Sequence, residues 1–178
     1  MADSSSVDSR ESEVDLGFLE EIDEALQPND FPSKIGGRPV WLNPSNIPQT
    51  VVCKACGNNA LFLGQVYAPK DSVSTAYHRT LYVFCCANGH CYKHGNCITV
   101  LRDQLPEIND FFSSDLSVEN SWSTLFSAIK FCELCGCASN KACSACHQVS
   151  YCSKYHQTLH WKKGHKRECG KYISMLKS

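Results

Sequence analysis

The sequence predicts a small α+β, zinc-stabilised protein, with a mainly β N-terminal zinc domain followed by a zinc finger with a short helix. Three observations lead to this prediction. The chain has 178 residues, enough for one ordinary domain or two small ones. Most of its 13 cysteines occur in pairs at the spacings of metal ligands. Short β-prone runs separated by turn residues occupy its middle, and a Lys- and His-rich stretch without proline near its end suits a helix.

Composition and charge narrow the class of protein. Hydrophobic residues make up 43% of the chain, which allows a modest core and excludes wholesale disorder. The net charge of −1 hides a split, because residues 1–30 carry a net −9, residues 31–131 a net +2 and residues 132–178 a net +6. The first residues lack the apolar core of a secretory signal, and the run Leu81–Ala87 is far shorter than the ~20 residues that span a bilayer. We therefore expect a reducing, intracellular compartment, where this many cysteines hold zinc rather than form disulfides.

The pattern of turns, strands and charges divides the chain into five stretches. These are an acidic disordered tail (1–14), a mainly β zinc-binding domain (15–112), a linker (113–131), a zinc finger (132–169) and a tail (170–178). Strands are expected at Leu61–Tyr67, Ala76–Cys86 and Ile98–Arg102. Apolar residues between Leu16 and Leu26 recur at helical spacing, but a short acidic helix and an extended lead-in both fit. Residues 113–131 fit a linker and a short helix equally well.

Eight candidate zinc ligands lie together in residues 132–169. They form four pairs: Cys132 and Cys135, Cys143 and Cys146, Cys152 and His156, and His165 and Cys169. A Cys-x2-Cys turn brings two sulfurs to one ion, and a pair at i and i+4 projects from one face of a helix, here expected over residues 153–168. Because structural zinc takes four ligands, eight ligands predict two closed sites. A segment this small is expected to need metal in order to fold.

A third site is predicted upstream. Cys53 and Cys56 form another tight-turn pair, and Cys86 and Cys91 follow a strand. Competing ligands surround them: Cys85, His90, His94 and Cys97. Neighbouring residues on a strand point to opposite faces, so only one of Cys85 and Cys86 can reach the metal, and we favour Cys86. The part played by the other competitors stays open.

The second half of the finger resembles the MYND zinc fingers. The resemblance rests on Tyr151-Cys152-Ser153-Lys154, His156-Gln157, His160-Trp161 and His165-x3-Cys169. It implies a cross-braced finger, in which Cys132, Cys135, Cys152 and His156 hold one ion and Cys143, Cys146, His165 and Cys169 hold the other. Most MYND fingers carry cysteine at the position of His156. The resemblance also implies an apolar groove for proline-rich peptides near Tyr151, Gln157 and Trp161, although Trp161 suits a plain core position equally well.

A longer succession of motifs resembles the programmed cell death protein 2 family. It comprises Leu16-Gly17-Phe18, the stretch from Phe31 to Leu42, Gln65-Val66-Tyr67-Ala68-Pro69, the stretch from His78 to Phe84, and Arg102-x-Gln104-Leu105-Pro106. This resemblance implies an adaptor or dedicated chaperone that acts on a small-subunit ribosomal protein in ribosome biogenesis, in the nucleus and cytoplasm. Members of the family normally continue well past the finger, so it also implies that the usual C-terminal part is missing here.

The ligand chemistry argues against an enzyme. Catalytic zinc keeps one coordination position open, whereas the predicted sites are filled, mainly by thiolates. The acidic first stretch suits a basic client such as a ribosomal protein. Two alternatives stay open: a MYND-mediated transcriptional corepressor adaptor or regulator of cell death and proliferation, and a direct DNA binder that uses the basic residues near Lys162. No membrane partner is expected.

Overall fold

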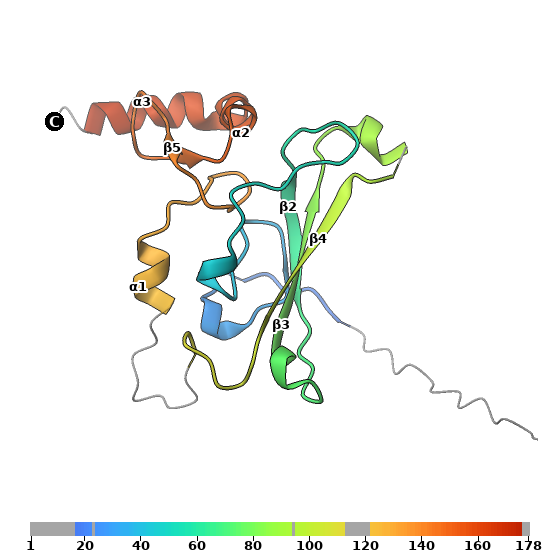
Figure 1. The fold of residues 1–178 in the computed structure, drawn as a ribbon. Coiled ribbons are helices and arrows are strands. Elements are labelled where there is room, and N and C mark those ends of the chain that lie inside the picture. The colour runs from blue at the N-terminus through green and yellow to red at the C-terminus, as the bar shows by residue number, and fades with distance from the viewer. Residues whose placement is uncertain (1–16, 23, 94, 113–121, 176–178) are drawn as a thin grey trace, which may run out of the picture.

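The structure is a computed structural model and describes residues 17–22, 24–93, 95–112 and 122–175 (Figure 1). The predicted acidic tail lies outside the described residues, as does the first part of the predicted linker. The strands are β1 (Lys34–Ile35), β2 (Leu61–Tyr67), β3 (His78–Cys85), β4 (Ile98–Leu105), β5 (Lys141–Ala142) and β6 (Ser150–Tyr151). The α-helices are α1 (Trp122–Ser127), α2 (Lys154–His160) and α3 (Lys166–Met175). The content is thus mixed α+β, as predicted.

A four-stranded antiparallel sheet in the order β1-β2-β3-β4 organises the first two thirds of the chain. β3 pairs with β4 without interruption, from His78 opposite Leu105 to Cys85 opposite Ile98. Because side chains alternate along a strand, the sheet has two different faces. The inner face buries Tyr82 and Phe84, whereas the outer face leaves several apolar side chains exposed. The long strands lie where the sequence predicts strands, although β4 continues past Arg102 to Leu105.

The irregular segment before β2 is bound to the inner face by buried polar groups. The backbone N–H of Val40 donates to Gln65 Oε1 at 2.8 Å, and Gln65 Nε2 donates to the Pro32 carbonyl at 2.9 Å. The Tyr82 hydroxyl accepts from the backbone N–H of Leu42 at 2.6 Å and donates to the Val40 carbonyl at 3.3 Å. A buried polar group costs stability unless it finds partners, and here the partners specify the path of this segment.

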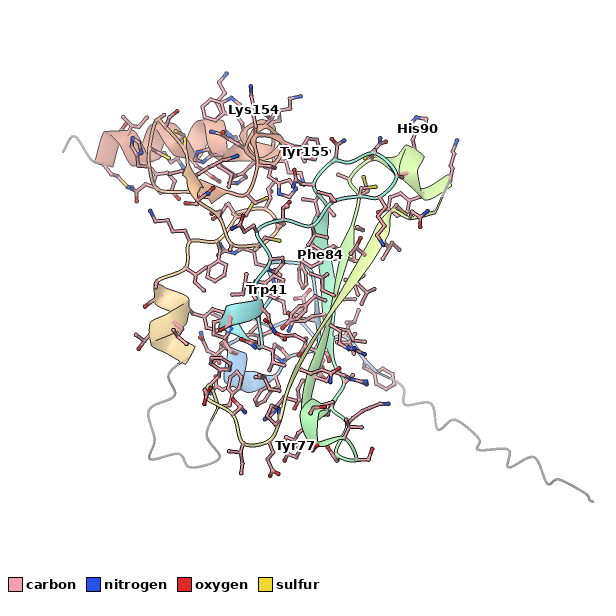
Figure 2. The ribbon with its side chains drawn as sticks, in the orientation of Figure 1. Trp41, Tyr77, Phe84, His90, Lys154 and Tyr155 are labelled. Carbon is pink, nitrogen blue, oxygen red and sulfur yellow. The ribbon has the colours of Figure 1, made fainter. Side chains whose placement is uncertain are left out.

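The finger packs on the same inner face, and the two regions share one hydrophobic core (Figures 1 and 2). Trp41 is 4% exposed and packs against Tyr82 in a tilted arrangement, with ring centroids 4.5 Å apart. Its indole N–H donates to the carbonyl of Gly136 in the finger at 2.8 Å. The core joins Trp41, Val51, Ala60, Phe62, Tyr82 and Phe84 to Cys132, Cys135, Cys137, Cys143, Cys146, Val149, Tyr151 and Cys169. Within the described residues the protein is therefore one folded body, not two separate modules.

Two predicted segments differ in detail. The expected helix over 153–168 is split into α2 and α3 by a π-helical turn, Trp161–His165, with non-helical backbone at Gly164. Residues 170–175 are not a tail, because α3 runs to Met175 and Ile173 packs against the core. In the described part of residues 113–131, the structure has the short helix that the sequence left open as an alternative: this part contains α1, and Phe126 packs against the same core.

The lead-in to the sheet is extended. Residues 17–22 and 24–27 form no helix, and Phe18 and Leu19 are exposed. Of the two alternatives left open by the sequence, the extended one fits the structure. No helix in the described part of the chain is long and apolar enough to cross a membrane.

Candidate metal centres

The structure brings the twelve candidate ligands together in three groups of four. In each group the sulfur and nitrogen atoms all lie within 4.8 Å of one another. The first cluster contains Cys53, Cys56, Cys86 and Cys91, the second contains Cys132, Cys135, Cys152 and His156, and the third contains Cys143, Cys146, His165 and Cys169. The second and third clusters take alternate ligand pairs along the chain, which is the cross-braced arrangement that the MYND resemblance implies.

The distances within the clusters fit zinc. With Zn–S near 2.3 Å and Zn–N near 2.05 Å, a tetrahedron places two sulfurs about 3.8 Å apart and a sulfur and a nitrogen about 3.6 Å apart. The Sγ atoms of Cys56 and Cys86, and those of Cys135 and Cys152, are 3.7 Å apart. Cys146 Sγ lies 3.7 Å from His165 Nε2. Such separations are too long for a disulfide, whose sulfurs are ~2.05 Å apart, and suit four ligands around one ion.

The first cysteine of each tight turn is prepared to act as a thiolate. Burial raises the pKa of Cys53, but the backbone N–H groups of Cys56 and Ala55 lower it to about 7. Burial likewise raises the pKa of Cys143, which N–H groups of its own turn and hydrogen bonding with His165 lower to about 6. Hydrogen bonds from Cys135 and Cys152 lower the pKa of Cys132. Because the thiolate is the form that binds metal, these turns favour metal binding.

The first cluster resolves part of the competition among ligands. Cys86 and Cys91 join Cys53 and Cys56, whereas Cys85 ends β3 outside the group. Cys97 is buried and packs against the cluster, and its carbonyl accepts from the Cys86 backbone N–H at 2.9 Å. His90 is exposed on the turn before β4 (Figure 2). His94 lies outside the described residues.

The second cluster lies against the sheet domain. His156 is fully buried, and its Nδ1 lies 3.5 Å from Cys132 Sγ and 3.3 Å from Cys152 Sγ. Burial lowers the pKa of His156, but hydrogen bonds with these two sulfurs outweigh it and raise the pKa to about 9. Zinc needs the neutral ring, so a metal ion in this cluster would displace the proton that the two thiolates otherwise hold.

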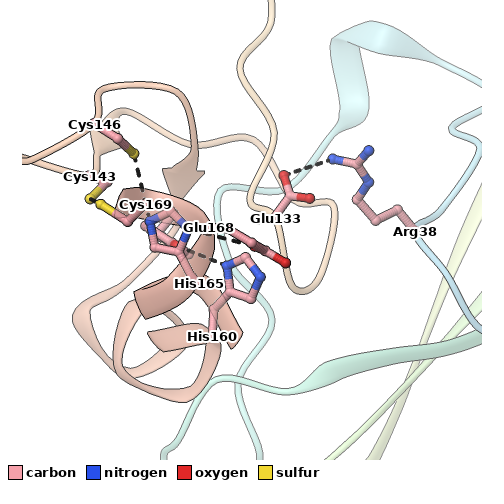
Figure 3. Close-up of polar contacts among 9 residues, drawn as sticks. Arg38, Glu133, Cys143, Cys146, His160, His165, Glu168 and Cys169 are labelled. Carbon is pink, nitrogen blue, oxygen red and sulfur yellow. Dashed lines mark hydrogen bonds and ion pairs between the residues drawn. The ribbon is translucent and has the colours of Figure 1, made fainter. Parts of the chain in front are cut away.

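The third cluster lies inside the finger (Figure 3). Cys143 Sγ and Cys169 Sγ are 3.9 Å apart, and both residues are buried, as are Cys146 and His165. Here His165 turns Nε2 toward the sulfurs, the opposite choice of ring nitrogen from His156. Figure 3 also shows an ion pair between Arg38 and Glu133, 3.3 Å apart, at the junction of the sheet domain and the finger.

The three residues expected near a peptide groove lie in different environments. Tyr151 is buried in the core, and its hydroxyl is 2.9 Å from His160 Nδ1, so it offers no surface to a peptide. Gln157 is partly buried on α2, and Trp161 is 39% exposed. Trp161 is therefore the exposed aromatic side chain of this region, and both Tyr151 and Trp161 pack edge-on against the ring of His165.

Several supporting groups could not be identified from ligand spacing. The carbonyl of Asn59 lies 3.3 Å from His156 Nε2, although the two residues are 97 positions apart. Gly136 accepts the indole N–H of Trp41. A sequence signal exists only for the glycine, since Gly57 and Gly136 both directly follow a Cys-x2-Cys pair, and both have positive φ, 73° and 67°.

Comparisons with known proteins agree with this architecture. Residues 13–119 match the family described as "Programmed cell death protein 2, N-terminal domain", and residues 132–169 match the MYND finger. Programmed cell death protein 2 of Bos taurus is 41% identical over 167 residues, and that of Mus musculus is 42% identical over 166; each alignment covers 88% of this chain and 48% of the relative. A Schizosaccharomyces pombe protein named "Probable 20S rRNA accumulation protein 4" is 32% identical over 89 residues, 49% of this chain and 22% of that protein. No solved structure matches.

Metal-binding clusters, a MYND finger and a sheet that shares its core define a zinc-binding protein of the protein-interaction class. The chain belongs to the programmed cell death protein 2 family. It spans about half the length of the curated relatives that it matches, at 48%.

Proposed function

We propose that this chain is an adaptor or dedicated chaperone, stabilised by three zinc ions, that holds a basic small-subunit ribosomal protein during ribosome biogenesis. This proposed role requires no catalysis. In this role the protein would act in the nucleus and the cytoplasm. The observation that carries the proposal is an acidic and apolar groove beside the outer face of the sheet.

The groove lies between the extended lead-in and the start of the sheet. It is lined by Phe18, Leu19, Glu20, Glu21, Ile22, Glu24, Ala25, Leu26 and residues 33–37. Phe18 is 88% exposed and Leu19 is 79% exposed, so apolar surface is presented beside three glutamates. Lys34 is the basic member of this lining. Such a groove suits a basic segment that also carries apolar side chains. Ribosomal proteins that have not yet bound RNA present segments of this kind.

The outer face of the sheet adjoins this groove. Its exposed apolar side chains are Ile35, Leu63, Val66, Ile98 and Val100. Register places Val83 between Gly64 and Val100, so these side chains lie on neighbouring strands and form a continuous surface. Exposed apolar patches of this kind mark interaction sites. Nothing among the described residues packs on this face.

The similarity to the S. pombe protein adds support, since its printed name links it to 20S rRNA. The alignment covers 49% of the present chain. The client is proposed from charge. Residues 1–30 contain ten acidic residues and one basic residue, and this excess of negative charge favours a positively charged partner.

The test is capture of a purified small-subunit ribosomal protein by the zinc-loaded chain. The variant Glu20→Gln/Glu21→Gln/Glu24→Gln should slow association about tenfold at low salt, because steering by opposite charge acts on the association rate. The difference should shrink as salt is added. Association rates measured by surface plasmon resonance at two salt concentrations give the result.

A matched control makes the same change in charge elsewhere. Asp71→Asn/Glu107→Gln/Asp110→Asn neutralises three exposed carboxylates that do not line the groove and should leave the rate unchanged. Reversal of Lys162, Lys163 and Lys166 to glutamate should leave capture intact or improve it. Capture that is lost on this reversal and indifferent to the groove glutamates would contradict the proposal.

The exposed Trp161 favours a second candidate function, docking of a proline-rich peptide at the finger in a corepressor adaptor or a regulator of cell death. It lies next to Gln157 in the folded finger and beside the exposed side chains of Lys162, Lys163, Lys166 and Arg167. If Trp161→Ala abolishes partner binding while the groove variant does not, this second candidate replaces the first. Salt-sensitive binding of DNA lost in the lysine reversal would instead support a direct DNA binder.

A further inference from the structure

The two ring nitrogens of His156 face two different parts of the protein. Nδ1 lies 3.5 Å and 3.3 Å from the sulfurs of Cys132 and Cys152, whereas Nε2 lies 3.3 Å from the carbonyl oxygen of Asn59. A carbonyl can only accept a hydrogen bond, so Nε2 carries the hydrogen. In the neutral ring that binds metal, the lone pair is then on Nδ1, directed at the metal position. Asn59 therefore selects the tautomer of His156 that binds metal.

Asn59 belongs to the tight turn that carries ligands of the first cluster. In this turn the backbone N–H of Cys53 donates to the Asn58 carbonyl at 2.8 Å, and that of Gly57 donates to the Cys53 carbonyl at 2.8 Å. Asn59 itself forms a bridge with Val52, which fixes the direction of its backbone. The carbonyl that orients His156 is thus held by the same turn that positions Cys53 and Cys56.

We propose that the first and second clusters are coupled sites: metal in the first cluster fixes the Asn59 carbonyl, and this strengthens metal binding by His156 in the second. The third cluster lies outside this connection, because within the described part of the chain Nδ1 of its histidine has no hydrogen-bond partner in the sheet domain. The inference rests on the proposed zinc occupancy of all three sites. Removal of a histidine ligand's hydrogen-bond partner typically weakens metal binding by about 10–100-fold, and by linkage each coupled site affects the other equally.

The chain offers a variant that keeps the ligand and removes the connection. His156→Cys retains a metal ligand, as in most MYND fingers, but has no N–H for Asn59. Cys56→Ser removes an exposed ligand of the first cluster. Together they form a double-mutant cycle that isolates the coupling. The full chain is loaded with cadmium, and the decay of each NMR resonance is followed after a chelator is added. The four-sulfur first site is distinguished by its ligands, and the second and third sites are assigned from the resonance that His156→Cys shifts and the one that it leaves in place.

In the otherwise unchanged chain, Cys56→Ser should accelerate metal loss from the second cluster about tenfold, at the lower end of the usual effect. In the His156→Cys background the same change should have less than about a twofold effect. The third cluster should keep its rate in every variant and serves as the internal control. Reciprocity of binding free energies gives a measurement that leaves the first cluster's ligands intact: His156→Cys alone should weaken cadmium binding to the first cluster, as measured by equilibrium competition with the chelator.

Equal acceleration in both backgrounds, or none in either, overturns the coupling. An unchanged first cluster in the His156→Cys chain also overturns it, even if Cys56→Ser proves unable to fold. Failure of the zinc proposal looks different, because the unmodified chain would then show fewer than three cadmium resonances. In that case the first site holds no metal and the coupling is rejected with it.

Discussion

The second and third clusters differ in what supports their histidine ligands. His156 binds through Nδ1 and donates from Nε2 to the Asn59 carbonyl in the sheet domain. His165 turns Nε2 toward the sulfurs, and its buried Nδ1 has no hydrogen-bond partner among the described residues. The nearest carboxylate oxygen, on Glu168, is 3.9 Å away (Figure 3). One site is thus supported from another part of the protein and the other only from its own helix.

The same contrast appears in the tight turns. Gly57 and Gly136 occupy equivalent positions, each directly after a Cys-x2-Cys pair and each with positive φ. A methyl group added to Gly57 would meet nothing within 4 Å, whereas one added to Gly136 would clash with Cδ of Pro39. The turn of the second cluster is therefore an interface as well as a ligand holder. We therefore expect the finger to derive part of its stability from the contact between Gly136 and Pro39 of the sheet domain.

The largest effect should come from removing the side chain at the centre of this interface. Trp41→Ala should cost about 3–5 kcal/mol of unfolding free energy, because it removes a buried indole and leaves the Gly136 carbonyl without its donor. Since the core is shared, the sheet and the second cluster should be lost together. Circular dichroism and zinc release followed through one thermal scan test this.

Val100→Ala is the control, because Val100 is 55% exposed on the outer face and should change stability by less than about 0.5 kcal/mol. If Trp41→Ala produced two separate transitions, with the finger retaining its zinc after the sheet had melted, the finger would be an independent module. The contrast between the two turns would then have no energetic consequence.

The second prediction compares the two turn glycines directly. Gly57→Ala should cost about 1–2 kcal/mol, the strain of placing an L-residue at positive φ. Gly136→Ala should cost the same strain plus about 1–3 kcal/mol, because the Pro39 side of the interface must move. Denaturant unfolding of the two variants gives the difference. Equal losses would show that the close packing at Gly136 adds nothing to stability.

Zinc chemistry explains why much of the site can be predicted from sequence. A tight turn needs Cys-x2-Cys and a helix face needs ligands at i and i+4, so the spacing predicts the groups that the structure brings together. The β-prone runs likewise predict β2 and β3 almost to the residue. Local patterns can be read because the forces that produce them act over a few residues.

The unpredicted features all depend on contacts between distant residues. Trp41 lies in a stretch that reads as irregular, yet it is central to the core because Gly136, 95 residues away, accepts its N–H. The sequence predicts a tail at residues 170–178, but Ile173 packs against the core and α3 extends to Met175. The lead-in has helical spacing and is extended: Leu19 and Ile22 remain exposed, so no burial of an apolar face stabilises a helix there.

The smallest predicted effect concerns the partner of His165 and compares its support with that of His156. Glu168→Gln should accelerate metal release from the third cluster by less than about tenfold, because its carboxylate is the nearest acceptor for His165 Nδ1 but is distant and half exposed. The second cluster should not respond.

Glu133→Gln is the matched control, since Glu133 pairs with Arg38 and has no hydrogen bond or ion pair with a histidine ligand among the described contacts. Release rates from cadmium resonances in the two variants are compared. No change in the third cluster with Glu168→Gln would mean that His165 needs no support from this carboxylate, whereas a change larger than that of removing the Asn59 contact would reverse the order of the two sites.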